Sequence, residues 1–344
     1  MTSTIAVEHE VDTAGALAAD AWSDGGRTVE SVPRTLAKAP GVRAEDDLAA
    51  AGRKILRFHF DRIRAREGGV RSGNDPEDVH AMRVATRRSR AAWRLLGDSF
   101  GGTPTKEHRQ RLRDLGRLLG EVRDLDVLLK ATEAYQASLS AARREGLEPL
   151  VAAWRADREE ARTRLVANLD ADWYRDWVAE YEAFTDVERG VDDGVLMATG
   201  RVRDMLPALI WTAYGHVRAY EPAFHGADLT TLHALRIASK RLRYTLEFGR
   251  EVMDPDSAAL IARVVALQDH LGLLNDARVG ASLASAFLSE CAGRLSARQA
   301  TAIRHYVGWR EREIERLRRS AGRPWHRVVG LPFRRALGRL TADL

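Results

Sequence analysis

The sequence predicts an all-α protein, and three observations support that fold class. Strong helix formers dominate from about residue 44 onwards, and apolar residues recur there every three or four positions. No stretch alternates apolar and polar residues with the period of two that a half-buried strand requires. Segments rich in Gly, Pro and Asp interrupt the pattern at intervals that suit long helices. We therefore expect bundles of long helices.

The interruptions divide the chain into its expected elements. Residues 1–43 contain two prolines and show no sustained period, so we expect a mostly flexible arm. A first long helix follows and ends at a break that runs from Gly68 to Pro76. Asp75 before Pro76 predicts the N-cap of the next helix, and Asp228 is the expected cap of a matching helix later in the chain. Further breaks fall at residues 101–104, 190–194, 222–228 and 254–257.

The composition narrows the class of protein. The chain has 344 residues, with 54 Lys and Arg against 49 Asp and Glu, and a formal charge of +5. It has no run of about eighteen apolar residues, so we expect no membrane association, and its N-terminus lacks the apolar core of a secretory signal. A single cysteine, Cys291, excludes an internal disulfide and a thiolate-rich metal site. We expect a cytoplasmic protein without metal or cofactor.

The chain contains an internal repeat. Residues 75–96 read DPEDVHAMRVATRRSRAAWRLL, and residues 228–249 read DLTTLHALRIASKRLRYTLEFG. A second matched pair follows in the same order, at residues 119–124 and 271–276. Two repeats of this length predict two homologous helical bundles about a pseudo-twofold axis, not a solenoid of short units. We place the domain at 44–320, with halves at about 44–190 and 191–320, and an Arg-rich tail at 321–344.

Each copy of the repeat carries a basic stripe along one face of its helix. At about 100° per residue, the basic positions of the first copy fall within an arc of about 80°. They follow the spacing that helices normally fill with Leu and Ile at an apolar seam. The first stripe consists of His80, Arg83, Arg87, Arg90 and Arg94, and the second of His233, Arg236, Lys240 and Arg243.

A basic face repeated in register needs a physical reason. Like charges three and four residues apart repel one another by about a few tenths of a kcal/mol per pair. A merely solvated face would not need the same register twice. Two such helices on pseudo-symmetric bundles would wall a groove of positive charge, which an extended polyanion neutralises best. The match breaks at one position, where Glu247 replaces Arg94.

Several other polar residues are weaker candidates for ligand contact. Arg113 and Arg117 share a face of the helix after the first stripe, but the second copy lacks a matching basic face. Tyr244 has a hydroxyl donor, although an aromatic residue in a helix more often packs in a core. Asp124 and Asp276 occur in both copies, and we expect them to orient an arginine or cap a turn. The weaker set comprises Lys54, Arg57, Arg94, Arg113, Arg117 and Tyr244.

The doubled His-x-x-Arg-x-x-x-(Arg/Lys)-Arg-x-Arg signature resembles the CHAD family, the conserved-histidine α-helical domain. The resemblance covers roughly residues 46–320, with VHAMRVATRRSR, LHALRIASKRLRY and both Leu-Gly-x-x-(Arg/Asn)-Asp turns in order. It implies two four-helix bundles with a basic groove between them, and binding of inorganic polyphosphate at polyphosphate granules. The ligand-facing residues that it implies are His80, Arg83, Arg87, Arg88, Arg90, His233, Arg236, Lys240, Arg241 and Arg243.

The chain departs from many CHAD proteins in lacking a CYTH domain, a β-barrel that forms a triphosphate tunnel. Fewer than 45 residues precede the first predicted helix, and the Glu-x-Glu-x-Lys motif of that barrel is missing. The resemblance therefore implies a binding protein and not a hydrolase.

Three alternatives to polyphosphate binding stay open. A nucleic acid would match the charge, but no aromatic residues interleave with the stripes for base stacking, so we do not expect one. A phosphatase acting on polyphosphate would use arginine clamps, but we find no P-loop, no HExxH motif and no compact carboxylate cluster for Mg²⁺. A scaffold for an acidic protein is the third. We predict non-catalytic polyphosphate binding, with the oligomeric state undetermined.

Overall fold

The computed structural model describes residues 36–100, 104–186 and 200–344, and these ranges are all-α as predicted. They contain no strand, and one isolated β-bridge joins Asp47 to Arg201. The first half holds α1 (Leu48–Ser72), α2 (Pro76–Leu96), α3 (Pro104–Ala137), α4 (Ala141–Leu169) and α5 (Asp172–Phe184). The second half holds α6 (Val202–Arg218), α7 (Leu229–Phe248), α8 (Ser257–Glu290), α9 (Ala297–Ser320), α10 (Gly322–Val329) and α11 (Leu331–Ala342).

The helices confirm the repeat and its predicted caps. The matched pair α2 and α7 have 21 and 20 residues, and α3 and α8 have 34 residues each. Asp75 accepts a hydrogen bond from the backbone N–H of Glu77 at 2.8 Å, and Asp228 accepts one from Thr231 at 2.7 Å. These side chains satisfy N–H groups that have no partner within the first helical turn.

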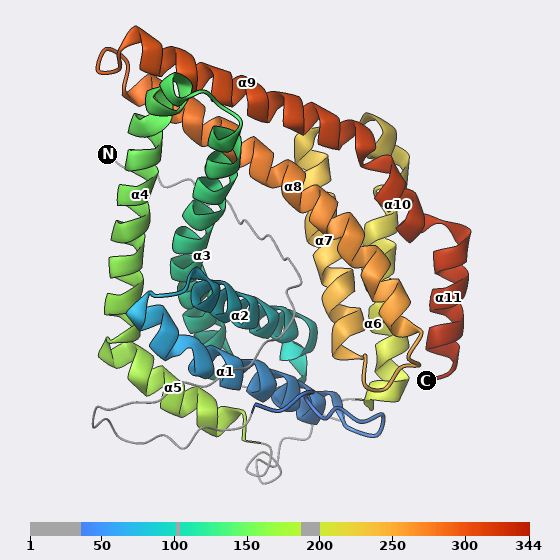
Figure 1. The fold of residues 1–344 in the computed structure, drawn as a ribbon. Coiled ribbons are helices and arrows are strands. Elements are labelled where there is room, and N and C mark those ends of the chain that lie inside the picture. The colour runs from blue at the N-terminus through green and yellow to red at the C-terminus, as the bar shows by residue number, and fades with distance from the viewer. Residues whose placement is uncertain (1–35, 101–103, 187–199) are drawn as a thin grey trace.

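The two halves repeat the same order of neighbouring helices (Figure 1). In the first half α1 packs on α2, α2 on α3 and α3 on α4; in the second, α6 packs on α7, α7 on α8 and α8 on α9. The halves also share a core at one end, where α4 packs against α9. Leu147 of α4 and Ile303 of α9 are fully buried there. Because of this shared core, a pair of separate four-helix bundles stays a prediction.

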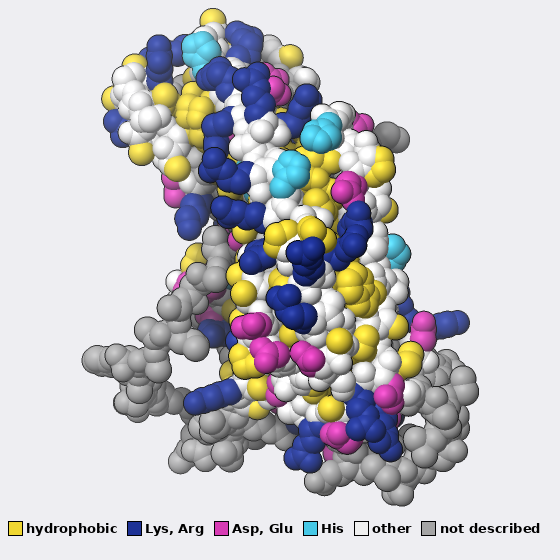
Figure 2. Space-filling view, turned by 90° about the vertical axis from the view of Figure 1, so that its right-hand side faces the viewer, with side chains coloured by type: hydrophobic (Ala, Val, Ile, Leu, Met, Phe, Trp, Pro, Cys, Tyr) yellow, Lys and Arg dark blue, Asp and Glu magenta, His cyan; other side chains and the backbone are white. Residues whose placement is uncertain are grey.

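The C-terminal residues 321–344, predicted as an Arg-rich tail, are helical. They form α10 and α11, which pack against α8. Trp325, Phe333 and Leu337 are buried within the main hydrophobic core, while the arginines between them lie on the outside. Figure 2 views the molecule from this side. The arginines dominate the composition of the segment and conceal a buried face of helical spacing.

The N-terminal arm lies mostly outside the described residues, since only positions 36–43 are described. At its end, the backbone N–H groups of Gly41 and Val42 each donate to the Glu251 carboxylate at 2.9 Å. Val42 is buried in the main core. The last residues of the predicted arm therefore pack against the second half of the molecule.

Helix α8 is the most apolar long helix of the described chain. Its length and composition alone satisfy the criteria for a membrane-spanning helix. It contacts α7, α9, α10 and α11, and many of its residues are buried in those contacts. Packing on several sides accounts for its apolar character, as in the central helix of a bundle.

Candidate functional site

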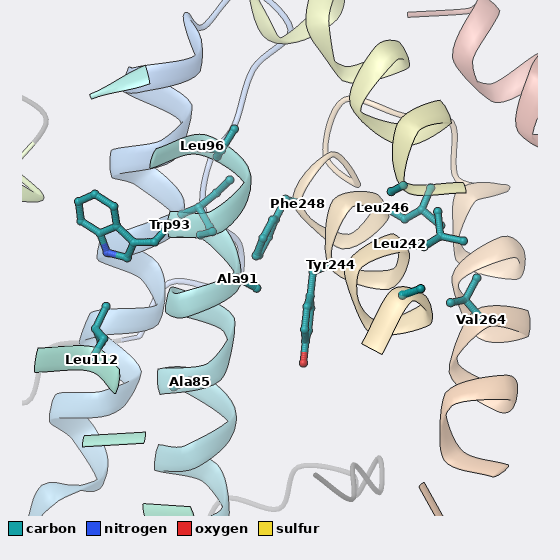
Figure 3. Close-up of a cluster of buried hydrophobic side chains, with 14 of the residues drawn as sticks. Ala85, Ala91, Trp93, Leu96, Leu112, Leu242, Tyr244, Leu246, Phe248 and Val264 are labelled. Carbon is teal, nitrogen blue, oxygen red and sulfur yellow. The ribbon is translucent and has the colours of Figure 1, made fainter. Parts of the chain in front are cut away.

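The two basic stripes lie on α2 and α7, which pack against each other where the halves meet. Figure 3 shows Tyr244 and Phe248 of α7 between the two helices, on the side of Ala91 of α2. The Nε–H of Arg87 on α2 donates to the Tyr244 hydroxyl at 2.5 Å. The stripes therefore face a common junction and not opposite outer surfaces.

Most of the stripe residues are buried in this junction. The residues exposed by less than a tenth of their surface are His80, Arg83, Arg87, Arg236, Lys240 and Arg243, with Arg236 at only 1%. Arg90, Arg88 and His233 are half-buried, and Arg94 and Arg241 are exposed. Burying a charge is costly unless nearby groups compensate it. The partners of these cations therefore decide what the junction can bind.

A small cavity opens beside the α2 stripe, and we call it the central cavity. It lies between α2, α3 and α8, so both halves of the chain contribute to it. Its polar lining consists of His80, Arg83, Arg87, Arg123, Asp124 and Asp276. Val84, Val127, Leu128 and Val279 complete the wall. The structure thus brings three residues of the first predicted stripe to one cavity.

No residue of the α7 stripe lines this cavity, but Arg236 and Lys240 of that stripe lie near Asp276, which does line it. Burial raises the pKa of the Asp276 carboxyl to about 6, although Arg236, Arg310 and Lys240, together with Arg83, act to lower it. These four cations come from α7, α9 and α2. Asp276 therefore lies close to basic residues of both stripes.

Positive charge exceeds negative charge around the central cavity. Asp124 forms an ion pair with Arg83 at 3.0 Å, which confirms that this aspartate orients an arginine. Asp276 is the other carboxylate in the lining. Arg83, Arg87 and Arg123 stand in the lining. Arg236, Lys240 and Arg310 lie near Asp276, and Arg310 is paired with Glu313 at 2.9 Å. An anion in the cavity would balance this excess.

The Nε of Arg123 supports the same conclusion. This nitrogen is buried and has no hydrogen-bond acceptor among the described residues. Buried donors in folded proteins are nearly always paired, and an acceptor bound in the cavity would satisfy this one.

One end of the junction is closed by an internal carboxylate. Glu247 pairs with Arg243 of its own helix at 2.6 Å and with Arg88 of α2 at 3.4 Å. Glu247 occupies the position of Arg94 in the repeat, so the one mismatch between the stripes ties α7 to α2. Arg88 and Arg243 were expected to face ligand, and in the structure both contact Glu247.

Burial and nearby cations favour the neutral form of His233. Its Nδ1 lies 3.1 Å from Oδ1 of Asn275. Burial lowers the pKa of His233, and the nearby Arg236 contributes in the same direction, although the Asn275 hydrogen bond opposes them. With Nδ1 donating to Asn275, the Nε2 lone pair is available to take up a proton when an anion approaches.

The glycines of α3 make room for the guanidinium groups of α2. A Cβ atom at Gly120 would lie 3.0 Å from Nη1 of Arg83, and one at Gly116 would lie 3.0 Å from Nη1 of Arg90. A side chain at either position would displace an arginine. Gly120 belongs to the repeated Leu-Gly motif, so this close approach explains the presence of glycine there.

The weaker candidates lie elsewhere. Lys54 pairs with Asp46, Arg57 with Asp61 and Glu182, and Arg117 with Glu121. Arg113 donates to Gln110 on its own helix. None of these basic residues, nor exposed Arg94, lines the central cavity. Tyr244 differs from these weaker candidates, because it contacts Arg87, which lines the cavity.

Sequence reasoning missed Arg123 and Arg310. Arg123 belongs to the second repeated motif, where the other copy has Asn275, so that motif was an available signal. No motif in the sequence singles out Arg310 of α9. It is buried, donates to the backbone oxygen of Asp276 at 2.9 Å and pairs with Glu313 at 2.9 Å. No cluster of three or more His, Cys, Asp or Glu residues in the described ranges is arranged to hold a metal ion.

Comparisons with known proteins identify the fold. The sequence model of the CHAD domain matches residues 54–285. The crystal structure of the CHAD domain from the plant Ricinus communis is similar with a TM-score of 0.69 and 24% identity, covering 88% of this chain and 98% of that one. PptA from Streptomyces chartreusis is similar with a TM-score of 0.64 and 15% identity, covering 82% of this chain and 100% of that one. No curated protein matches the chain in sequence.

Proposed function

Because the chain belongs to the CHAD domain family, we propose that it binds inorganic polyphosphate at the central cavity and does not catalyse a reaction there. The observation that carries the proposal is the charge balance at the junction. Cations from both halves meet around one cavity, whose lining holds three arginines and two carboxylates. Every unit of polyphosphate carries a negative charge and oxygen acceptors, so a segment of the chain supplies what the junction lacks.

Binding would rest on charge-assisted hydrogen bonds in a partly dry site. The planar guanidinium groups of Arg83, Arg87 and Arg123 suit phosphate oxygens, and Asp124 holds Arg83 in place. Removal from water strengthens each of these bonds relative to a surface contact. The oxygens that accept them occur on every unit, so the site would recognise charge and spacing and not a chain terminus.

The decisive experiment is a salt-titrated binding assay. The logarithm of the affinity for long polyphosphate should fall linearly with the logarithm of the salt concentration, with a slope set by the number of phosphates neutralised. Single-stranded RNA, DNA and ATP serve as competitors, and Arg155→Ala serves as a control, since Arg155 is exposed and remote from the cavity lining. Equal affinity for RNA, or an equal loss from Arg155→Ala, would contradict the proposal.

The absence of catalysis is tested by release of phosphate from polyphosphate and triphosphate with Mg²⁺ or Mn²⁺. We expect no turnover above that of buffer. Steady turnover that disappears in His80→Ala would replace the binding proposal with a phosphatase, because His80 lines the central cavity.

We also propose that this binding brings the protein to polyphosphate granules in the cytoplasm. A fluorescent fusion should form foci with granules and become diffuse in Arg236→Gln. Foci that persist in cells without polyphosphate would contradict this localisation.

A further inference from the structure

The positive charge of the chain is concentrated in its last three helices. Residues 297–344, which form α9, α10 and α11, contain twelve arginines and four acidic residues. Their formal excess of eight is larger than the +5 of the whole chain, so the preceding residues are acidic overall, with 42 Lys and Arg against 45 Asp and Glu. This concentration lies beyond residue 285, where the match to the CHAD domain ends.

These arginines are on the surface, in contrast to those of the central cavity. Only Arg310 of the twelve is buried, and the other eleven are exposed. Seven of the eleven form no ion pair with a carboxylate in the part of the chain that the structure describes. These seven are Arg304, Arg312, Arg323, Arg327, Arg334, Arg335 and Arg339.

Five of the exposed arginines follow a single helical face, which we call the α9–α10 stripe. Its members are Arg312, Arg316, Arg319, Arg323 and Arg327. Their spacing of four, three, four and four residues keeps them within an arc of about 80° on a helix. Ala321, between α9 and α10, has the helical torsions φ −62° and ψ −24°, so the helical path continues from one helix to the next. The stripe is about 22 Å long by helical rise.

The surface around the stripe is strongly basic. Figure 2 shows Lys and Arg side chains gathered over the upper part of this side of the molecule, at the height of α9, and most acidic side chains lower down. Arg312, Arg316 and Arg319 line a shallow hollow with Glu315 and Ser320. Glu315 pairs with Arg319 at 2.8 Å, and Glu313 lies 3.8 Å from Arg316. The remaining arginines of the stripe keep their charge uncompensated.

We propose that the α9–α10 stripe is a second polyphosphate-binding surface, which holds a segment of the chain outside the central cavity. This inference rests on the proposed function. It extends that function from one buried site to two contacts on the same molecule, so that long chains bind more tightly than short ones through the higher effective concentration of the second segment.

The residues beside the stripe favour polyphosphate over two other anionic partners. Trp325 and Tyr306 are buried, and the half-buried Trp309 stacks on Tyr135 with ring centroids 4.7 Å apart. The aromatic rings of α9 and α10 are therefore engaged within the protein and not free to stack on the bases of a single-stranded nucleic acid. The apolar faces of α10 and α11 are buried in the core through Val328, Phe333 and Leu337, so they cannot enter a lipid surface as an amphipathic helix does. A flexible chain with charge on every unit needs neither feature.

The chain offers a matched pair of triple variants for the test. One variant, Arg312→Gln with Arg323→Gln and Arg327→Gln, removes three charges from the stripe. The control, Arg334→Gln with Arg335→Gln and Arg339→Gln, removes three charges from α11. All six residues are exposed and form no ion pair within the described ranges, so both triple variants change the net charge equally and disturb no buried contact. Tripolyphosphate and long polyphosphate are the two probes.

We expect the stripe variant to lose about tenfold in affinity for long polyphosphate and to reduce the salt slope by about three. Its affinity for tripolyphosphate, which reports the central cavity, should stay that of the wild type. For long polyphosphate, the decrease in the logarithm of the affinity should be less than half as large in the α11 variant as in the stripe variant. Equal losses in both variants, or no loss in the stripe variant, would overturn the second surface.

Failure of the proposed function has a different signature. If Arg83→Gln leaves tripolyphosphate binding unchanged, the central cavity is not the site, whatever the stripe variant does, because Arg83 lines that cavity. A DNA duplex that binds the wild type as tightly as long polyphosphate, and loses as much in the stripe variant, would show a surface for any polyanion and overturn its assignment to polyphosphate.

Discussion

The basic stripes of α2 and α7 come from matched sequence, yet equivalent residues lie in different surroundings. Arg83 of α2 pairs with Asp124, whose side chain is 25% exposed. The equivalent Arg236 of α7 lies near Asp276, and both are buried. Burial raises the pKa of Asp276 to about 6 despite the surrounding cations. The second half of the site is therefore drier, and a change of charge there should have the larger effect.

The mismatches between the copies join the two halves. Tyr244 stands where the first copy has Ala91, and it reaches across to accept a hydrogen bond from Arg87. Glu247 stands in place of Arg94 and pairs with Arg88 of α2. The comparison shows that the repeated residues supply the positive field, whereas the residues that differ hold α7 against α2.

The largest expected effect on affinity comes from replacing each of the two equivalent arginines with glutamine. Arg236→Gln should weaken polyphosphate binding on the order of 100-fold, because truncating a desolvated charge costs about 2–5 kcal/mol in a binding site. Arg83→Gln should cost about tenfold, since Arg83 is already compensated by Asp124. Binding isotherms at constant ionic strength, with circular dichroism as a check of folding, measure the difference. An equal or larger loss from Arg83→Gln would remove the distinction between the halves.

The next largest effect is expected on stability, at the contact of Glu247 with Arg88 and Arg243. Glu247→Gln leaves Arg88 and Arg243 without their shared carboxylate, and should lower the free energy of unfolding by about 2 kcal/mol. Chemical denaturation measures it. Glu107→Gln is the control, because the ion pair of Glu107 with Arg111 is on the surface, within one helix, and should contribute less than about 1 kcal/mol. Similar stabilities for the two variants would show that Glu247 does not hold the halves together.

The pH dependence of binding should distinguish the two aspartates. A bound anion disfavours the carboxylate of Asp276, so its pKa rises above about 6 on binding, and protons are taken up. Binding also raises the lowered pKa of His233. The affinity for polyphosphate should therefore increase several-fold as pH falls from about 8 to 6.

The variant Asp276→Asn should bind polyphosphate more tightly than the wild type at pH 8 and show a shallower pH profile, with the remaining slope due to the histidines. Asp124→Asn, measured alongside, removes the other carboxylate of the cavity lining. A wild-type affinity that does not vary with pH would exclude proton uptake by any of these groups.

The smallest effect is expected at the contact between Tyr244 and Arg87. Tyr244→Phe removes one buried hydrogen bond and should cost about 1 kcal/mol of stability and a few-fold in affinity for polyphosphate. Thermal unfolding and binding isotherms of the same sample measure both. If the stability and the affinity of Tyr244→Phe both equal those of the wild type, the hydroxyl does not position Arg87.

The local features of the fold were predictable from the sequence. Asp75 and Asp228 cap their helices as expected, because an N-cap involves only the residue and the turn that follows it. The equal lengths of α3 and α8 agree with the repeat. Three of the first-stripe residues, His80, Arg83 and Arg87, were named from periodicity alone, and the structure places them together at the central cavity.

The features that depend on distant parts of the chain were not predictable. Arg310 enters the site from α9 and contacts Asp276 of α8, and no spacing within either helix indicates that contact. The fold of residues 321–344 was concealed by the arginines on their outer face. The pairing of Glu247 with Arg88 joins residues 159 positions apart in the sequence.

Sequence alone determined that this protein is helical, internally repeated and marked by two basic stripes in register, because capping, periodicity and repetition are properties of short segments. Only the tertiary structure decided that most stripe residues are buried, that Glu247 pairs with Arg88 between α7 and α2, and that an exposed positive face lies on α9 and α10. The physical reason is that the solvation and pairing of a charge are set by whichever groups the fold brings beside it.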